Sequence, residues 1–208
     1  MTAMLPTMIG MNEASKGTRD HEERRREESR KQRCHLTARC AFTEGVQHRV
    51  AVHNAHVCLG LDGRIYIMKL PHPSLGFFNG GFFQHPDLPP ENTAGLVTIS
   101  GETPPTLRWV FLDAETHEMR WGTKQESEGQ ICGPFDWTKD EAYITLQDWE
   151  GWMAVRDPSD EARMKEELGL EESSDIWKLC FDQNDDGADL PGNAEVLEVR
   201  LRRTTASS

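Results

Sequence analysis

Short β-like segments separated by turn residues follow Cys34, and this alternation limits the fold more than any other feature of the chain. Two of these segments, 48–59 and 64–70, flank Gly60-Leu61-Asp62-Gly63, which is a strong hairpin signal. About nine such segments follow one another with little helical periodicity. A parallel α/β sheet would need helices between its strands. The sequence therefore predicts a mostly β domain, either a single small antiparallel β-barrel or a β-sandwich.

The remaining segments give the expected order of elements. Further strands are predicted at 95–100, 107–113, 118–122, 142–146, 149–156, 175–182 and 194–203. Residues 71–93 contain five prolines and four phenylalanines, which predicts a long irregular segment. A turn is expected at 133–138 and one short helix near 160–168. His117 is expected in the left-handed position of a tight turn, where histidine is tolerated.

Charge is distributed unevenly along the chain. The first 40 residues hold nine Lys or Arg against six Asp or Glu, although the whole chain has a net charge of -12. We expect residues 1–18 to be disordered, 19–40 to form a charged helical arm, and 41–205 to form the β domain. The arm is either a solvated helix or a segment that docks a partner or directs nuclear import. The acidic β domain would be repelled by nucleic acid, because binding to phosphates needs clustered cations.

The cysteine content and the hydropathy pattern favour an intracellular location. The five cysteines are irregularly spaced and odd in number, unlike those of a small disulfide-linked secreted domain. The first residues lack a secretory signal pattern, and no apolar run approaches the ~18 residues that span a bilayer. We therefore predict a cytoplasmic or nuclear protein with reduced cysteines and no membrane partner.

An aspartate-rich loop is the sharpest local signal. Asp182, Asn184 and Asp186 have the 1, 3, 5 spacing of a calcium loop, and Gly187 stands at position 6. Position 12 is Asn193 instead of glutamate, and strands are predicted on both sides, so the loop is not an EF-hand. It is either a calcium-binding half-loop or an acidic hairpin turn, since Asp, Asn and Gly are common turn formers. No other cofactor is expected.

Tryptophan is unusually frequent. The six tryptophans are Trp109, Trp121, Trp137, Trp149, Trp152 and Trp177. Aromatic rings on β-strands line a ligand cavity in some small barrels and fill the core in others. The sequence leaves both interpretations open.

No catalytic or zinc-binding pattern is present in the sequence. Histidines and cysteines are numerous but lack the spacing of a four-ligand zinc site. The leading hypothesis is therefore a non-enzymatic β domain that binds a small ligand or a protein partner. One alternative is a cofactor-free isomerase or cyclase with an aromatic cavity, for which Asp136 or His85 would be the polar group. Another is a structural protein with a calcium-stabilised loop.

Several sequence landmarks carry a resemblance. The segments HPSLGFFNGGFFQHP, LRWVFLDAETHEMRWG, GPFDWT, WEGWMAV and IWKLCFDQNDDG occur in this order, after RRR and RCHL. They resemble a family of small uncharacterised proteins from filamentous ascomycete fungi, over roughly residues 22–203. The resemblance implies that the tail joins the domain through Cys34-His35-Leu36. It also implies that Asp182–Gly187 is a family feature. It implies no activity.

Overall fold

The computed structural model describes residues 8–40, 48–70, 72–89, 94–99 and 103–205. The chain forms two compact units, Met1–Gln32 and Arg33–Ser208, each of which is considered by itself.

The first unit contains one helix, α1 (Met8–Lys31), which is rich in charged residues. Arg30 and Lys31 lie in its last turn, where positive charge is favourable next to the exposed carbonyl groups. Disorder was expected over residues 1–18, of which 1–7 lie outside the described residues, whereas α1 begins at Met8. The arm expected over 19–40 ends earlier, because the residues from Cys34 onward form a strand. Among the described residues, no helix combines the length and apolarity needed to cross a membrane.

The second unit is almost entirely β. Its described helices are α2 (Arg49–Val52) and α3 (Glu161–Glu167). Its described strands are β1 (Cys34–Cys40), β2 (His56–Leu59), β3 (Ile65–Met68), β4 (Gly76–Phe77), β5 (Gly80–Gln84), β6 (Ala94–Ile99), β7 (Leu107–Leu112), β8 (Met119–Gly122), β9 (Phe135–Trp137), β10 (Ile144–Leu146), β11 (Trp152–Arg156), β12 (Ile176–Phe181) and β13 (Glu195–Thr205).

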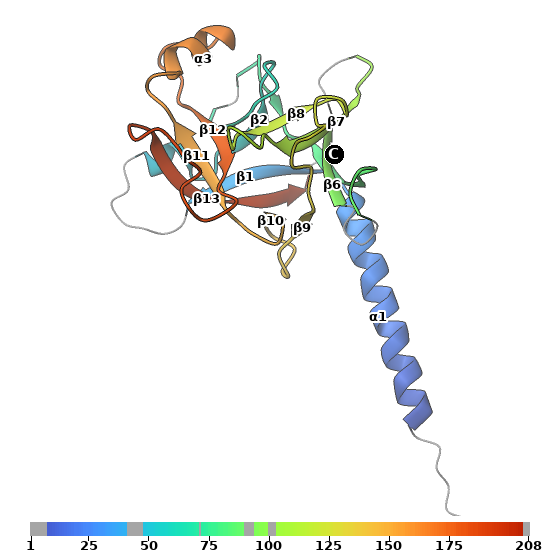
Figure 1. Ribbon diagram of the computed structural model, residues 1–208. Coiled ribbons are helices and arrows are strands. Elements are labelled where there is room, and N and C mark those ends of the chain that lie inside the picture. Colours follow the sequence, from blue (N-terminus) through green and yellow to red (C-terminus); the bar gives the residue numbers. More distant parts are fainter. Residues whose placement is uncertain (1–7, 41–47, 71, 90–93, 100–102, 206–208) are drawn as a thin grey trace, which may run out of the picture. The chain divides into compact units, whose positions relative to one another are not determined.

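Six of these strands close into an antiparallel barrel (Figure 1). The order is β1-β2-β3-β12-β11-β13, and β13 returns to β1. The longest seam runs from the pair Cys34↔Thr205 to the pair Cys40↔Val199. The pair Thr37↔His56 joins β1 to β2 and completes the circle. The prediction of a small antiparallel β domain is confirmed, and the closure shows a barrel and not a sandwich.

Further strands extend this barrel and then return to it. β5, β6, β7 and β8 continue the sheet from β1 as successive antiparallel neighbours. β8 lies back against the barrel through isolated bridges that join Arg64 to Arg120 and Glu118 to Cys180. The turn between β2 and β3 is thereby brought next to β8, and this junction builds the first pocket described below.

The barrel is filled by apolar side chains. The largest fully buried ones include Trp152, Trp177, Phe135 and Phe181. Removal of such rings from water is the main favourable contribution to folding. All five cysteines are buried and free, and burial raises the pKa of the Cys58 thiol to about 12. The thiols are therefore poor nucleophiles.

Three local predictions need correction. The segment 48–59 is not one strand, because His48 has a φ of 66° and the chain forms α2 before β2 begins. The segment 71–93 is not irregular throughout, since it contains β4 and β5. Gly80 permits the pairing of β5 with β6, because a Cβ at this position would lie 1.8 Å from the carbonyl oxygen of Val97. The predicted turn at 133–138 includes strand β9. The prediction for His117 is confirmed, with a φ of 56°.

Candidate functional site

The six tryptophans differ in burial, and three of them line pockets. Trp137, Trp152 and Trp177 are buried in the main core, and Trp109 is half-buried against the ring of His85. Trp121 lines one pocket, and Trp149, which is 43% exposed, lines a second one together with the buried Trp152. We call these the Arg120 pocket and the Trp149 pocket. The first is lined by Leu61, Asp62, Gly63, Arg108, Phe111, Asp113, Arg120, Trp121, Gly122, Thr123, Glu126 and Gln130.

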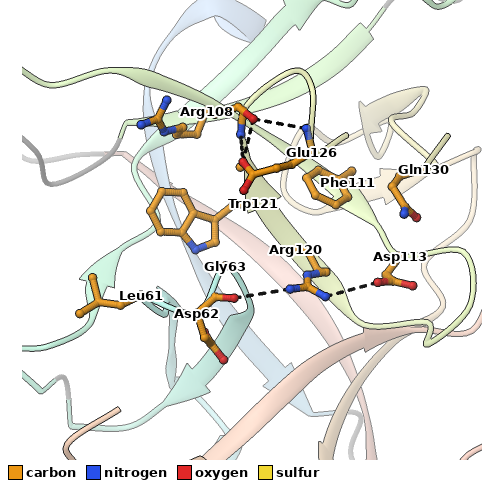
Figure 2. A pocket seen from close by; sticks show the side chains of 12 residues that line it. Leu61, Asp62, Gly63, Arg108, Phe111, Asp113, Arg120, Trp121, Glu126 and Gln130 are labelled. Carbon is orange, nitrogen blue, oxygen red and sulfur yellow. Dashed lines mark hydrogen bonds and ion pairs between the residues drawn. The ribbon is translucent and has the colours of Figure 1, made fainter. Parts of the chain in front are cut away.

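Trp121 builds one side of the Arg120 pocket, next to Gly63 of the β2–β3 turn (Figure 2). It fixes this turn against β8, because its backbone N–H donates to the Gly63 carbonyl at 2.9 Å and its indole N–H donates to the Gly60 carbonyl at 2.9 Å. Gly63 has a φ of 79°, which favours glycine. The predicted hairpin turn is therefore also a wall of the pocket, whose volume is about 530 Å³.

Arg120 lies between two acceptors in this pocket (Figure 2). Its guanidinium donates to the Asp113 carboxylate and to the backbone carbonyl of Asp62, each at 3.5 Å. Charge-assisted hydrogen bonds of arginine are usually about 2.7–2.9 Å long. Both contacts are therefore long, and the guanidinium is only weakly engaged by the protein.

The three carboxylates of the pocket are engaged much more closely. Asp62 accepts from the Tyr66 hydroxyl at 2.6 Å and from Arg64 at 3.1 Å. Glu126 accepts from the backbone N–H of Thr123 at 2.6 Å, and this N–H together with the Thr123 hydroxyl lowers the pKa of Glu126. Burial alone would raise the pKa of Asp113, but the backbone N–H groups of residues 116 and 115 lower it below its ordinary value. Their negative charge is therefore largely offset by their own surroundings.

A partly buried ion-pair network lies beside this pocket. Glu118 accepts from Arg64 at 2.8 Å and from Lys178 at 2.8 Å, and Lys178 also lies 3.6 Å from Asp160. Burial lowers the pKa of Lys178, but the hydrogen bond and the charge of Glu118 outweigh it, so the pKa is raised. The network joins β3, β12 and the start of β8 and holds the pocket walls together.

Comparison with known proteins identifies the family. The sequence model of a family described as a fungal beta-trefoil domain matches residues 10–207. The chain belongs to this fungal β-trefoil family. The match covers almost the whole chain and confirms the resemblance to a fungal family. No curated protein and no solved structure matches the chain.

The aspartate-rich loop of the trefoil domain folds around one carboxylate. Asp182 accepts from the backbone N–H groups of Asp186 at 3.1 Å and Gly187 at 2.8 Å. Burial raises the pKa of Asp182, but these N–H groups lower it by more, so that the net shift of the pKa is downward. Asp186 accepts from the N–H of Ala188, and Asn184 is exposed. Within the described ranges, no three His, Cys, Asp or Glu side chains are grouped to hold a metal. The calcium hypothesis gains no support from this geometry and stays a prediction.

The two polar residues considered for catalysis lie outside both pockets. His85 is 2% exposed, and its Nδ1 accepts from the backbone N–H of Asp87 at 3.2 Å. Asp136 accepts from the backbone N–H of Trp137 at 2.7 Å. Arg120, in contrast, has no local sequence signal that marks it as a site residue. It stands in the predicted strand 118–122 as one of many arginines, and only the contact between β8 and the β2–β3 turn distinguishes it.

Proposed function

We propose that this β-trefoil protein is a non-enzymatic binding module whose Arg120 pocket holds a small molecule with an anionic group next to an apolar ring. The observation that carries the proposal is the weak engagement of Arg120, whose two contacts within the pocket are both 3.5 Å long. A guanidinium has five N–H donors in a planar fork, so Arg120 retains donors for a carboxylate or phosphate.

The size and lining of the pocket support a small ligand. Its volume of about 530 Å³ falls in the range of small-molecule sites. Trp121 and the exposed Leu61 supply apolar surface, and Trp121 is held in place by its two hydrogen bonds to the turn. A preorganised ring and a charged donor together orient a ligand at low entropic cost.

The state of the pocket carboxylates supports binding over acid–base catalysis. A general acid or base works best with a pKa near the operating pH. The pKa values of Asp113 and Glu126 are shifted downward, away from that range. Asp62 is held by Arg64 and Tyr66. The isomerase or cyclase alternative would need one of these groups to be released from its partners.

A titration with two small probes tests the proposal. Benzoate carries a ring and a carboxylate, and benzyl alcohol is its neutral counterpart. The indole N–H resonance of Trp121 in the full-length protein reports on the pocket. We expect benzoate, and not benzyl alcohol, to shift this resonance in a saturable manner. Arg120→Gln should weaken benzoate binding by roughly tenfold, since hydrogen bonds to charged groups contribute about 1.5–3 kcal/mol.

Arg202→Gln is the matched control, because Arg202 is an exposed residue of β13 and does not line the pocket. Equal binding of benzoate to the Arg120→Gln variant and to the control would contradict the proposal. Equal shifts with both probes would show that the pocket recognises rings without reading charge. Circular dichroism of both variants checks that the fold is retained.

A further inference from the structure

The Trp149 pocket is separate from the Arg120 pocket and shares no residue with it. Its volume is about 330 Å³, and it lies where the Asp182–Gly187 loop meets the start of β11 and the middle of β13. Its lining includes Trp149, Gly151, Asp185, Glu198 and Arg200. The volume lies at the lower end of the range for small-molecule sites.

Trp149 is fixed in position although its ring is exposed. Gln147 and Asp148 have φ angles of 54° and 61°, as in a two-residue hairpin turn of type I′. Two backbone hydrogen bonds between Leu146 and Trp149, of 3.0 and 3.1 Å, close this turn. The indole N–H donates to the Asp182 carbonyl at 2.9 Å. A ring held in this way gives up little freedom when a ligand binds.

Gly151 allows the ring to lie so close to the Asp182 loop. A Cβ at this position would stand 2.3 Å from the Asp182 carbonyl oxygen and 2.3 Å from the indole nitrogen of Trp149. These are the two atoms of the hydrogen bond that fixes the ring. The glycine, the turn and the hydrogen bond therefore act together to present the exposed ring.

The charges of the pocket do not balance. Arg200 is engaged by Glu150 through two hydrogen bonds of 2.7 and 2.8 Å and lies 3.6 Å over the ring of Tyr143. Asp185 and Glu198 are exposed, and neither has a hydrogen bond or ion pair from its side chain to another residue in the part of the chain that the structure describes. Two uncompensated carboxylates thus stand beside a fixed aromatic ring.

We propose that the Trp149 pocket binds a small organic ammonium ion. The face of an indole ring attracts cations, most strongly when the cation is partly desolvated, and quaternary ammonium groups are bound in this way. Asp185 and Glu198 supply the opposite charge, and the acidic chain, with a net charge of -12, favours the approach of cations. This inference rests on a different pocket from the proposed function, so either can fail alone.

Choline and its neutral isostere 3,3-dimethylbutan-1-ol provide the test in the full-length protein. The indole N–H resonance of Trp149, assigned by its loss in Trp149→Phe, reports on the pocket. We expect choline to shift this resonance in a saturable manner and the isostere to leave it unchanged. Glu198→Gln should weaken choline binding roughly threefold, and added salt should weaken it further. Glu115→Gln is the matched control, because Glu115 is exposed and lines neither pocket.

Three results would overturn the inference. Equal shifts with choline and the isostere would show an apolar pocket without preference for cations. Equal affinity in Glu198→Gln and the control would remove the role of the carboxylate. A resonance that responds to calcium chloride but not to choline at equal ionic strength would assign the loop to a metal ion.

Discussion

Trp152 and Trp149 stand three positions apart, both line the Trp149 pocket, and each donates its indole N–H to a backbone carbonyl, yet the two residues differ sharply in burial. The Trp152 bond to Ile144 is 2.8 Å long and the Trp149 bond to Asp182 is 2.9 Å long. Trp152 is 2% exposed and packs edge-on against Phe181, with ring centroids 4.7 Å apart, whereas Trp149 is 43% exposed. A satisfied indole N–H therefore does not distinguish a buried ring from an exposed ring. The apolar surface that each ring removes from water does.

The largest effect is expected for Trp152→Ala. Removal of a fully buried ring leaves a cavity in the barrel, and such substitutions cost about 3–5 kcal/mol of the free energy of unfolding. Urea denaturation followed by circular dichroism measures this loss. Trp149→Ala is the natural partner variant and should cost only about 1 kcal/mol, mainly through the lost hydrogen bond to Asp182. Similar losses in the two variants would show that Trp149 is a structural ring.

An intermediate effect is expected for Gly151→Ala, which keeps both rings but crowds the space between Trp149 and the Asp182 loop. Since the added Cβ would lie 2.3 Å from the Asp182 carbonyl oxygen and 2.3 Å from the Trp149 indole nitrogen, the turn or the loop must move. Overpacking of this kind costs about 1–3 kcal/mol. Gly192→Ala is the control, because its Cβ would meet nothing within 4 Å. If the Trp149 indole N–H resonance were unchanged in Gly151→Ala, the ring would not depend on this close approach.

The strands and turns of the β domain are predicted by the sequence much better than the burial of the tryptophan rings and the position of the pockets. The Gly60–Gly63 turn, the left-handed His117 and the succession of strands follow from local chemistry, and together they predicted a small antiparallel β domain. Ring burial does not follow from local chemistry. Trp149 and Trp152 share the segment WEGW, and the burial of each ring depends on contacts with residues distant in sequence, Asp182 and Phe181 respectively. The Arg120 pocket depends in the same way on the meeting of β8 with the β2–β3 turn, which no local pattern encodes.

The smallest effect is expected for Asp182→Asn, and it is measured as a change in the pH dependence of the free energy of unfolding. The pKa of Asp182 lies below its ordinary value of 3.8, so its carboxylate stabilises the folded state above the unfolded pKa, and this contribution is lost as pH falls through the folded pKa. Between about pH 5 and pH 2.5 the wild type should therefore lose more stability than Asp182→Asn. The difference should stay below about 1 kcal/mol, because the loop is open to solvent. Asp189→Asn, which changes an exposed carboxylate of the same segment, should retain the wild-type slope.

Denaturation curves repeated with calcium chloride and with chelator complete the comparison. Stabilisation by calcium that disappears in Asp182→Asn would make the loop a metal site, whereas equal curves would make it the turn that positions Trp149.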